Sequence, residues 1–344
     1  MAEFLGIDYP TWWFLVVGAV FSGYAILDGF DLGAGALHLF FKKDSSRRIA
    51  LNAVGPVWDG NEVWLVIGGG TLFAGFPLVY ATLFSAMYIP FMLFLLFIIL
   101  RAVSIEFRSK EPMEWWRRSW DVVYSFSSIL LAVLLGVVMG NVLQGLPLDK
   151  DHEFTGSWLA FFNPFALLLG FTTLALMTLH GAIYLCLKTH GKLFEKIERL
   201  LKWSIIAFVL LFAASSGYAL LYIPHLLDNL QANPYLFVVP VLAMLSIANI
   251  PRLVSKRKFK AAFVFSALTF SFLLILLAVE LYPTLLFSTT ALEHSITIYN
   301  AASSDKSLEI MLVFVLIGTP LVLFYTYIVY RTFWGKVELD DTSY

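Results

Sequence analysis

Residues 261–283 read AAFVFSALTFSFLLILLAVELYP, a run in which Glu280 is the one charged side chain. An apolar run of about 20 residues forms a helix long enough to cross the hydrocarbon core of a bilayer, which is roughly 30 Å thick. Similar runs recur along the whole chain of 344 residues, of which 60% are hydrophobic and 14% are charged. Because soluble domains are typically about 25% charged, the composition excludes a water-soluble protein and indicates a polytopic membrane protein.

The apolar runs predict nine transmembrane helices. Helices are expected because the runs are continuous, whereas the strands of a membrane barrel alternate apolar and polar residues. The predicted fold is therefore an all-α polytopic membrane protein. The nine helices are predicted near residues 12–40, 54–75, 79–103, 120–144, 158–187, 203–224, 235–251, 261–283 and 308–331.

The basic residues predict how the chain is oriented in the membrane. Of the 23 Lys and Arg residues, 21 fall in the C-terminal tail or in alternate connections, beginning with the connection between the first two runs. Lys150 and Lys306 are the two exceptions. This count assigns Arg101 and Arg108 to the connection between the third and fourth helices. By the positive-inside rule these segments are cytoplasmic, so the N-terminus is expected outside and the C-terminus inside. No basic residue precedes Lys42, so the first run is expected to remain as a helix and not to be cleaved as a signal peptide.

A weak repeat divides the chain into two halves. Gly18 is followed ten positions later by Asp28-Gly29, and Gly170 is followed ten positions later by His180-Gly181. Four helices in each copy is an even number, so both copies would have the same orientation in the membrane. The expected parts are a first four-helix bundle in 1–150, a second four-helix bundle in 151–285, and an outer loop, a peripheral ninth helix and a cytoplasmic tail in 286–344.

Four acidic residues are the first candidates for function, because a charge at the centre of a membrane helix costs roughly 2.5–3.5 kcal/mol. Asp28 and Asp31 end the first run, and Asp59 and Glu62 begin the second. Each pair is spaced by three residues and so shares a helix face. A hairpin between the two runs would bring all four acids to a similar depth in the inner half of the membrane. We therefore expect them to share protons and to begin a proton path from the cytoplasmic side.

A structural role is the alternative for these acids, and packing is the expected role of the nearby glycines. The acids could cap helix ends, or pair with Arg47, Arg48 or a partner subunit, and so hold the fold. The glycines suit close contact between helices. They are Gly29 and Gly33, which are four residues apart, Gly35, and Gly136 and Gly140, which are also four residues apart.

The histidines and the cysteine argue against a cofactor bound by this chain. A transmembrane haem with two histidine ligands needs them on facing helices, but His180 is the one histidine deep within a run, and His38 lies at the inner end of the first. We expect His180 to be hydrogen-bonded or to relay protons, and not to ligate a haem. Cys186 is the sole cysteine, which rules out an iron–sulfur cluster and a thiolate zinc site. No metal site and no nucleic-acid partner is predicted.

Two motifs resemble subunit II of the cytochrome bd family of quinol oxidases. They are Asp28-Gly-Phe-Asp-Leu-Gly and Pro56-Val-Trp-Asp-Gly-Asn-Glu-Val-Trp-Leu65. The resemblance implies two four-helix bundles plus one peripheral helix, in a non-haem subunit that is needed for assembly with subunit I. Subunit I would carry the haems b and d, oxidise quinol and reduce dioxygen to water. Further matching pieces spread the resemblance over nearly the whole chain: Arg108-Ser-Lys, Gly140-Asn-Val-Leu-Gln-Gly-Leu-Pro147, Asn163-Pro-Phe165 and residues 261–269.

The resemblance also implies a proton route at the contact between the two subunits. Asp31 and Asp59 stand at the matching positions, whereas Glu62 departs from the pattern, because relatives vary there and some carry an amide or a histidine. A structural quinone in this subunit and a small accessory subunit are components that the resemblance allows. The implied location is the bacterial cytoplasmic membrane, with lipid around the bundle.

Two other functions remain open on the sequence. An ion-coupled secondary transporter would also show a repeated bundle, few buried acids and no cofactor ligands. Pro90 and Pro240 are the matched pair of helix interruptions that would favour it. A structural scaffold would differ from an oxidase subunit only if all the buried acids could be neutralised without loss of turnover.

Overall fold

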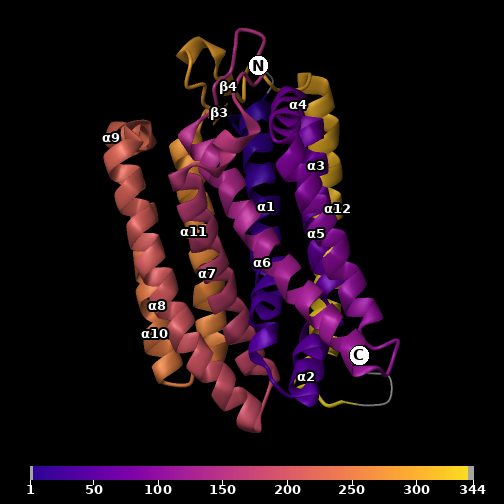
Figure 1. Ribbon diagram of the computed structural model, residues 1–344. Helices are drawn as coiled ribbons and strands as arrows, with labels where there is room; N and C mark the ends of the chain where they lie inside the picture. Colours follow the sequence, from indigo (N-terminus) through magenta and orange to yellow (C-terminus); the bar gives the residue numbers. More distant parts are fainter. Residues whose placement is uncertain (1–2, 340–344) are drawn as a thin grey trace.

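Long helices run side by side through most of the chain in the computed structural model, which describes residues 3–339 (Figure 1). Eight helices in this range are long and apolar enough to cross a membrane, and α3 with α4, bent by 120°, makes a ninth span if the pair is counted as one. The described chain begins at one end of the bundle and finishes at the other, as an odd number of crossings requires. The prediction of an all-α, multispanning protein is confirmed.

The elements follow one another along the chain. In order they are β1 (Glu3–Phe4), β2 (Ile7–Asp8), α1 (Tyr9–Leu37), η1 (His38–Phe40), α2 (Asp44–Val54), α3 (Trp58–Gly75), α4 (Pro77–Ala86), α5 (Tyr88–Phe107), α6 (Glu114–Gln144), η2 (Trp158–Phe162), α7 (Pro164–Lys188), α8 (Gly191–Tyr222), η3 (Pro224–Leu227), α9 (Asp228–Ala232), η4 (Pro234–Phe237), α10 (Val238–Ser255), α11 (Phe259–Leu281), β3 (Thr284–Leu286), η5 (Leu292–His294), β4 (Ile296–Thr297) and α12 (Asp305–Thr332).

The second and third crossings differ in detail from the prediction. The run predicted near 79–103 is divided between α4 and α5. Pro90 has no N–H to donate to the carbonyl of Ala86, so the α4 ladder cannot continue past that point. Pro77 begins α4, where the fixed φ of proline suits a first helical turn. Two antiparallel sheets of two strands each, β1–β2 and β3–β4, were also not predicted, because such short strands show no hydropathy period.

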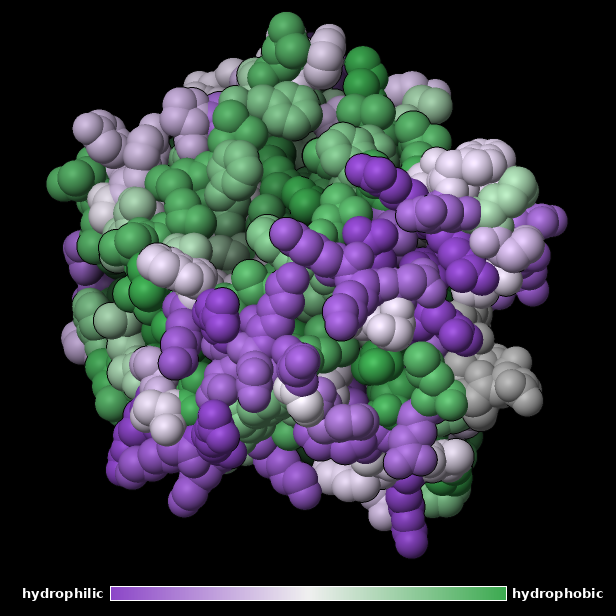
Figure 2. Space-filling model, turned by 60° about the horizontal axis from the view of Figure 1, so that its bottom comes forward, coloured by the Kyte–Doolittle hydropathy of each residue, from purple (hydrophilic) through white to green (hydrophobic). Residues whose placement is uncertain are grey.

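The two ends of the bundle differ in polarity. We call the end that carries α2 the inner end, and the end that carries β3 and β4 the outer end (Figure 1). The connections from α5 to α6, from α7 to α8 and from α10 to α11 all lie at the inner end with α2. Figure 2 looks onto this end and shows hydrophilic side chains gathered there. The connections that hold most of the basic residues therefore share one end of the molecule.

Helix α1 is central, since it contacts α3, α6, α7, α11 and α12. Its glycines allow the close approach. A Cβ added at Gly33 would overlap the carbonyl oxygen of Met177 on α7, and one added at Gly181 would overlap the backbone of Ala34. A Cβ at Gly35 would overlap the Ser128 hydroxyl on α6. The three helices therefore meet at backbone distance around the inner half of α1.

Helices α6 and α7 also cross closely. A Cβ at Gly136 would lie 2.6 Å from the Cα of Gly170, and one at Gly140 would lie 2.6 Å from the Cα of Ala166. Gly29 differs from the other predicted packing glycines, because its Cβ would lie 3.4 Å from Phe270, which is ordinary van der Waals contact. A methyl group would fit at Gly29 without forcing the helices apart.

Candidate functional site

A buried ion pair joins α1 to α5. Arg101 Nη2 donates to Asp28 Oδ1 at 2.6 Å, and Arg101 Nη1 donates to Asp28 Oδ2 at 3.1 Å. Both side chains are fully buried. Arg101 Nη1 also lies 3.4 Å from Glu62 Oε2 on α3. The Arg101 guanidinium thus links three helices. It binds both oxygens of the Asp28 carboxylate on α1, which is the strongest kind of charged hydrogen bonding, and it makes a longer contact with Glu62 on α3.

This geometry corrects the assignment of Arg101 to a connecting loop. Arg101 lies inside α5, and its exposed fraction is 0%. A cation can lie there because Asp28 neutralises it and accepts from both of its terminal nitrogens, whereas Arg101 Nε has no hydrogen-bond partner in the described chain. The expectation that Arg47 or Arg48 would pair with these acids was also wrong for Asp28. Asp28 pairs with Arg101, and Arg47 pairs with Asp121. A basic residue inside the end of an apolar run, with acids on two neighbouring runs, was the sequence signal for this pair.

Asp31 lies three residues further along α1 and is also fully buried. Asn61 Nδ2, on α3, donates to Asp31 Oδ2 at 2.7 Å. Tyr330, on α12, donates its hydroxyl to Asn61 Oδ1 at 2.8 Å. The other carboxyl oxygen, Asp31 Oδ1, is buried and has no hydrogen-bond partner within the described part of the chain. Buried polar atoms are nearly always paired in proteins, so an unpaired carboxyl oxygen marks Asp31 as a candidate functional group.

Asp59 does not join this group. It is exposed on the outward side of α3, in line with the exposed Val63 and Val66. Asn61 lies about 200° further round the helix and faces inward toward Asp31. The expectation of four acids in one cluster was therefore wrong: Asp28, Asp31 and Glu62 gather around Arg101 and Asn61, and Asp59 faces away. A three-residue spacing shows which residues share a side of a helix, but not which side packs inward.

A second charged network lies at the inner end and was not predicted. Its centre is Asp121 on α6, with an exposed fraction of 1%. Arg108 Nε donates to Asp121 Oδ1 at 2.6 Å, Arg47 Nη1 donates to Oδ2 at 2.9 Å, and His38 Nε2 lies 2.5 Å from Oδ1. Arg108 also donates to Asp44 on α2 at 2.8 Å. The network therefore joins the end of α1, helix α2, the end of α5 and the start of α6.

Arg108 is buried although the sequence placed it in a solvated loop. Burial lowers the pKa of its guanidinium, but the hydrogen bonds and charges of Asp121 and Asp44 raise that pKa by more. The net direction is upward, so Arg108 stays charged at every pH at which the protein is folded. Arg108 is therefore a permanent charge in the network that fastens the inner end.

His180 has no free ring nitrogen to offer a haem. His180 Nδ1 lies 2.6 Å from the Ser266 hydroxyl, and His180 Nε2 lies 3.1 Å from the carbonyl oxygen of Ile26. Both ring nitrogens are thus engaged within the chain, and the ring stacks on Phe263 with centroids 4.6 Å apart. His38 is a second fully buried histidine, which corrects the expectation that His180 alone is embedded. Within residues 3–339 no group of three or more His, Cys, Asp or Glu side chains could hold a metal ion.

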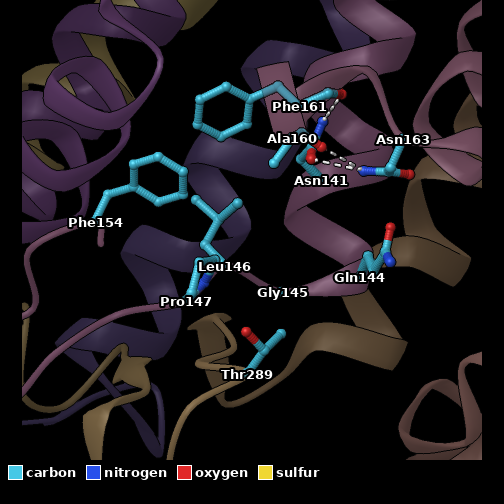
Figure 3. A pocket seen from close by; sticks show the side chains of 10 residues that line it. All are labelled: Asn141, Gln144, Gly145, Leu146, Pro147, Phe154, Ala160, Phe161, Asn163 and Thr289. Atoms are coloured by element: carbon cyan, nitrogen blue, oxygen red, sulfur yellow. Dashed lines mark hydrogen bonds between the residues drawn. The ribbon is translucent and has the colours of Figure 1, made fainter. Parts of the chain in front are cut away.

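A cavity of about 270 Å³ lies at the outer end of α6, and none of Asp28, Asp31, Asp59 and Glu62 lines it (Figure 3). Its wall contains the stacked rings of Phe154 and Phe161, whose centroids are 4.8 Å apart. Asn141 Nδ2 donates to the carbonyl of Phe161 at 2.8 Å, and Asn163 Nδ2 donates to Asn141 Oδ1 at 3.0 Å. These bonds connect two of the motifs that carried the resemblance, and they hold the α6–α7 connection against the end of α6.

Comparisons with known proteins agree over almost the whole chain. The family model described as cytochrome bd terminal oxidase subunit II matches residues 9–333. Cytochrome bd-I ubiquinol oxidase subunit 2 from Escherichia coli (strain K12) is 31% identical, with 97% of each chain covered. Cytochrome bd ubiquinol oxidase subunit 2 from Bacillus subtilis (strain 168) is 32% identical over 93% of this chain and 95% of that one.

A solved structure supports the fold. A chain in the structure of bd oxidase from Geobacillus thermodenitrificans superposes with a TM-score of 0.80 and 19% sequence identity. The match covers 94% of this chain and 98% of that chain.

Proposed function

This chain belongs to the family of cytochrome bd terminal oxidase subunit II, and we propose from this premise that it is the non-haem subunit of a quinol:dioxygen oxidoreductase. It is not catalytic alone. Its partner, subunit I, carries the haems b and d, oxidises quinol and reduces dioxygen to water. The hydrogen-bonded His180 supports a subunit without haem of its own. The ion-coupled transporter alternative has no support from the family match.

We propose that this subunit supplies protons to the reaction, and the observation that carries this is the buried, unpaired Oδ1 of Asp31. Reduction of dioxygen to water consumes protons, which must be brought through the membrane. Asp31 takes up a proton from the inner side and releases it toward subunit I. Asp59 is exposed on the lipid- or partner-facing side of α3 and serves at the contact between subunits. Asp28, neutralised by Arg101, holds the structure, and Glu62 adds charge beside them.

Asp31→Asn and Asp59→Asn test this proposal. An amide keeps the size of the side chain but cannot take up and release a proton at a carboxyl oxygen. We expect Asp31→Asn to lower oxygen consumption per haem by about 100-fold, within the range for a lost proton-transfer group, and Asp59→Asn to lower it less. Haem content is expected to stay unchanged in both. The measurement is quinol-driven oxygen consumption of the purified complex, normalised to its visible haem spectrum.

Asp228→Asn is the matched control, because Asp228 is an exposed acid at the start of α9. It is expected to leave turnover unchanged. Reduced haem content with normal turnover in the remaining complex would instead support a structural role for Asp31. Full turnover per haem in both amide variants would remove Asp31 and Asp59 from the proton route.

We also propose the orientation and the division of the bundle. The chain lies in the bacterial cytoplasmic membrane with the N-terminus outside and the C-terminus inside. Residues 1–150 and 151–285 make two four-helix bundles, and residues 286–344 supply the outer loop, the peripheral helix and the tail. A small accessory subunit and a structural quinone are to be sought by mass spectrometry of the purified complex.

Two reporters test the orientation. A reporter that is active only in the cytoplasm is expected to be active when it is fused after the C-terminus. An epitope inserted between residues 149 and 153 is expected to be accessible from outside the cell. The physical reason is that the connections at the inner end hold most of the basic residues. Detection of both labels on the same side would contradict the nine-span topology.

A further inference from the structure

We propose that Tyr330 on α12 is a positioning residue that determines which oxygen of Asp31 carries the exchangeable proton, and that it acts through Asn61. The inference rests on the proposed function of Asp31 as a proton carrier. It concerns a helix that the sequence predicts to be peripheral, and a tyrosine that lies 269 positions from the asparagine it contacts.

The orientation of the Asn61 amide follows from its two hydrogen bonds. The Tyr330 hydroxyl has one hydrogen and donates it to Asn61 Oδ1 at 2.8 Å. The amide oxygen therefore faces α12, and Nδ2 faces α1, where it donates to Asp31 Oδ2 at 2.7 Å. Asn61 is 2% exposed and Asp31 is fully buried, so water does not compete freely for either bond.

This orientation assigns the proton on Asp31 to one oxygen. An N–H group can only donate, and a carboxyl oxygen that holds the proton is a poorer acceptor than the other one, so the bond from Asn61 disfavours the proton on Asp31 Oδ2. The proton is therefore taken up and released at Oδ1, the oxygen without a partner in the described chain. If the amide turned over, its oxygen would face Asp31 Oδ2 and would accept a proton held there. In that state the Tyr330 hydroxyl could only accept from Nδ2–H and would lose the acceptor of its own hydrogen, so Tyr330 favours the observed orientation and keeps the proton available at Oδ1.

The Tyr330 ring is itself held in place. It packs edge-on against Phe30 of α1, with ring centroids 6.4 Å apart and an interplanar angle of 81°. On its other side Tyr330 lines a cavity of about 280 Å³ with Tyr327, Arg331 and Trp334. The hydroxyl thus joins the surface of α12 to the buried site on α1. Tyr327 lies in the same cavity, one helical turn away, and contacts Arg331 within its own helix.

The test compares Tyr330→Phe with Tyr327→Phe in the complete, haem-containing complex. Infrared difference spectra report the carboxyl C=O stretch of Asp31, which is identified by its loss in Asp31→Asn. Tyr330→Phe removes the bond to Asn61 and is expected to shift this band and to lower oxygen consumption per haem by roughly two- to tenfold, as loss of one hydrogen bond implies. Haem content is expected to be unchanged. Tyr327→Phe is expected to change neither quantity.

An unshifted band in Tyr330→Phe would overturn the proposal, and so would a shifted band with full turnover. If Tyr330→Phe lowered the haem content, Asn61→Leu would give a second measurement, because it removes both hydrogen bonds at similar volume and must also shift the band. The proposed function fails separately, through full turnover in Asp31→Asn. In that case turnover would no longer test Tyr330, and the band in Tyr330→Phe would alone report whether Tyr330 positions the carboxyl group.

Discussion

Replacement of Arg101 by glutamine is expected to abolish assembly of the haem-containing complex. The substitution leaves Asp28 fully buried without its counter-ion, since Arg101 donates a hydrogen bond to each oxygen of that carboxylate. Removal of one partner of a buried ion pair costs about 3–5 kcal/mol, which is a large share of the roughly 5–15 kcal/mol that separates folded from unfolded proteins. The measurement is the amount of this subunit and of haem in isolated membranes, by immunoblot and visible spectrum.

Two controls separate the ion pair from a general effect of lost charge. Arg252→Gln removes an exposed arginine near the inner end of α10 and is expected to leave assembly unchanged. The double variant Asp28→Asn with Arg101→Gln removes both charges and is expected to restore part of the lost complex, because no uncompensated charge remains. If membranes with the Arg101→Gln variant contained normal amounts of this subunit and of haem, the fold would not depend on this ion pair.

Gly33→Val is expected to have an effect of similar size, by separating α1 from α7. The first carbon of any side chain at residue 33 would overlap the carbonyl oxygen and carbonyl carbon of Met177, which belong to the backbone and cannot move without moving α7. Overpacking of a well-packed core costs about 1–3 kcal/mol when side chains can adjust, and more is expected here. Thermal unfolding of the detergent-solubilised complex, followed by loss of the haem spectrum, measures the effect.

Gly29→Ala is the matched control on the same helix. Its added methyl group would meet Phe270 at 3.4 Å, an ordinary contact, and the nearest atom belongs to a side chain. Alanine also favours a helix over glycine by about 1 kcal/mol, so the stability of Gly29→Ala is expected to equal or exceed that of the natural protein. Equal melting of Gly33→Ala and Gly29→Ala would contradict the close approach of α1 and α7.

The crossings could be predicted from the sequence because the bilayer imposes a minimum apolar length on each of them. The ends of the helices could not be predicted, since they depend on local backbone hydrogen bonding and on proline and not on hydropathy. The helix predicted near 54–75 corresponds to α3, which begins only at Trp58, and α2, which ends at Val54, lies in the connection that was predicted before it. The bend between α3 and α4 falls in the connection predicted between residues 75 and 79, whereas the break at Met87 follows from Pro90, which does not interrupt the hydropathy of the run near 79–103.

The site could be predicted in part, because buried acids are costly and therefore conspicuous. Asp28 and Asp31 were found in this way. Arg101 was missed because a basic residue near the end of an apolar run usually anchors a helix at the interface. Asn61 and Tyr330 were missed because neutral polar groups are cheap to bury when paired, and their pairing spans most of the chain. Asp121 lies near the start of its helix, where an acid needs no special explanation.

The network around Asp121 also constrains the order in which the protein can be completed during its synthesis. His38, Arg47 and Arg108 all leave the ribosome before Asp121, which is the acceptor that they share. Until α6 has emerged, Arg47 lacks this acceptor and Arg108 has Asp44 alone of its two carboxylate partners. The inner ends of α1, α2 and α5 therefore cannot lock together as they are inserted one after another. The network is complete only once α6 has been inserted, because α6 carries the carboxylate on which His38, Arg47 and Arg108 converge.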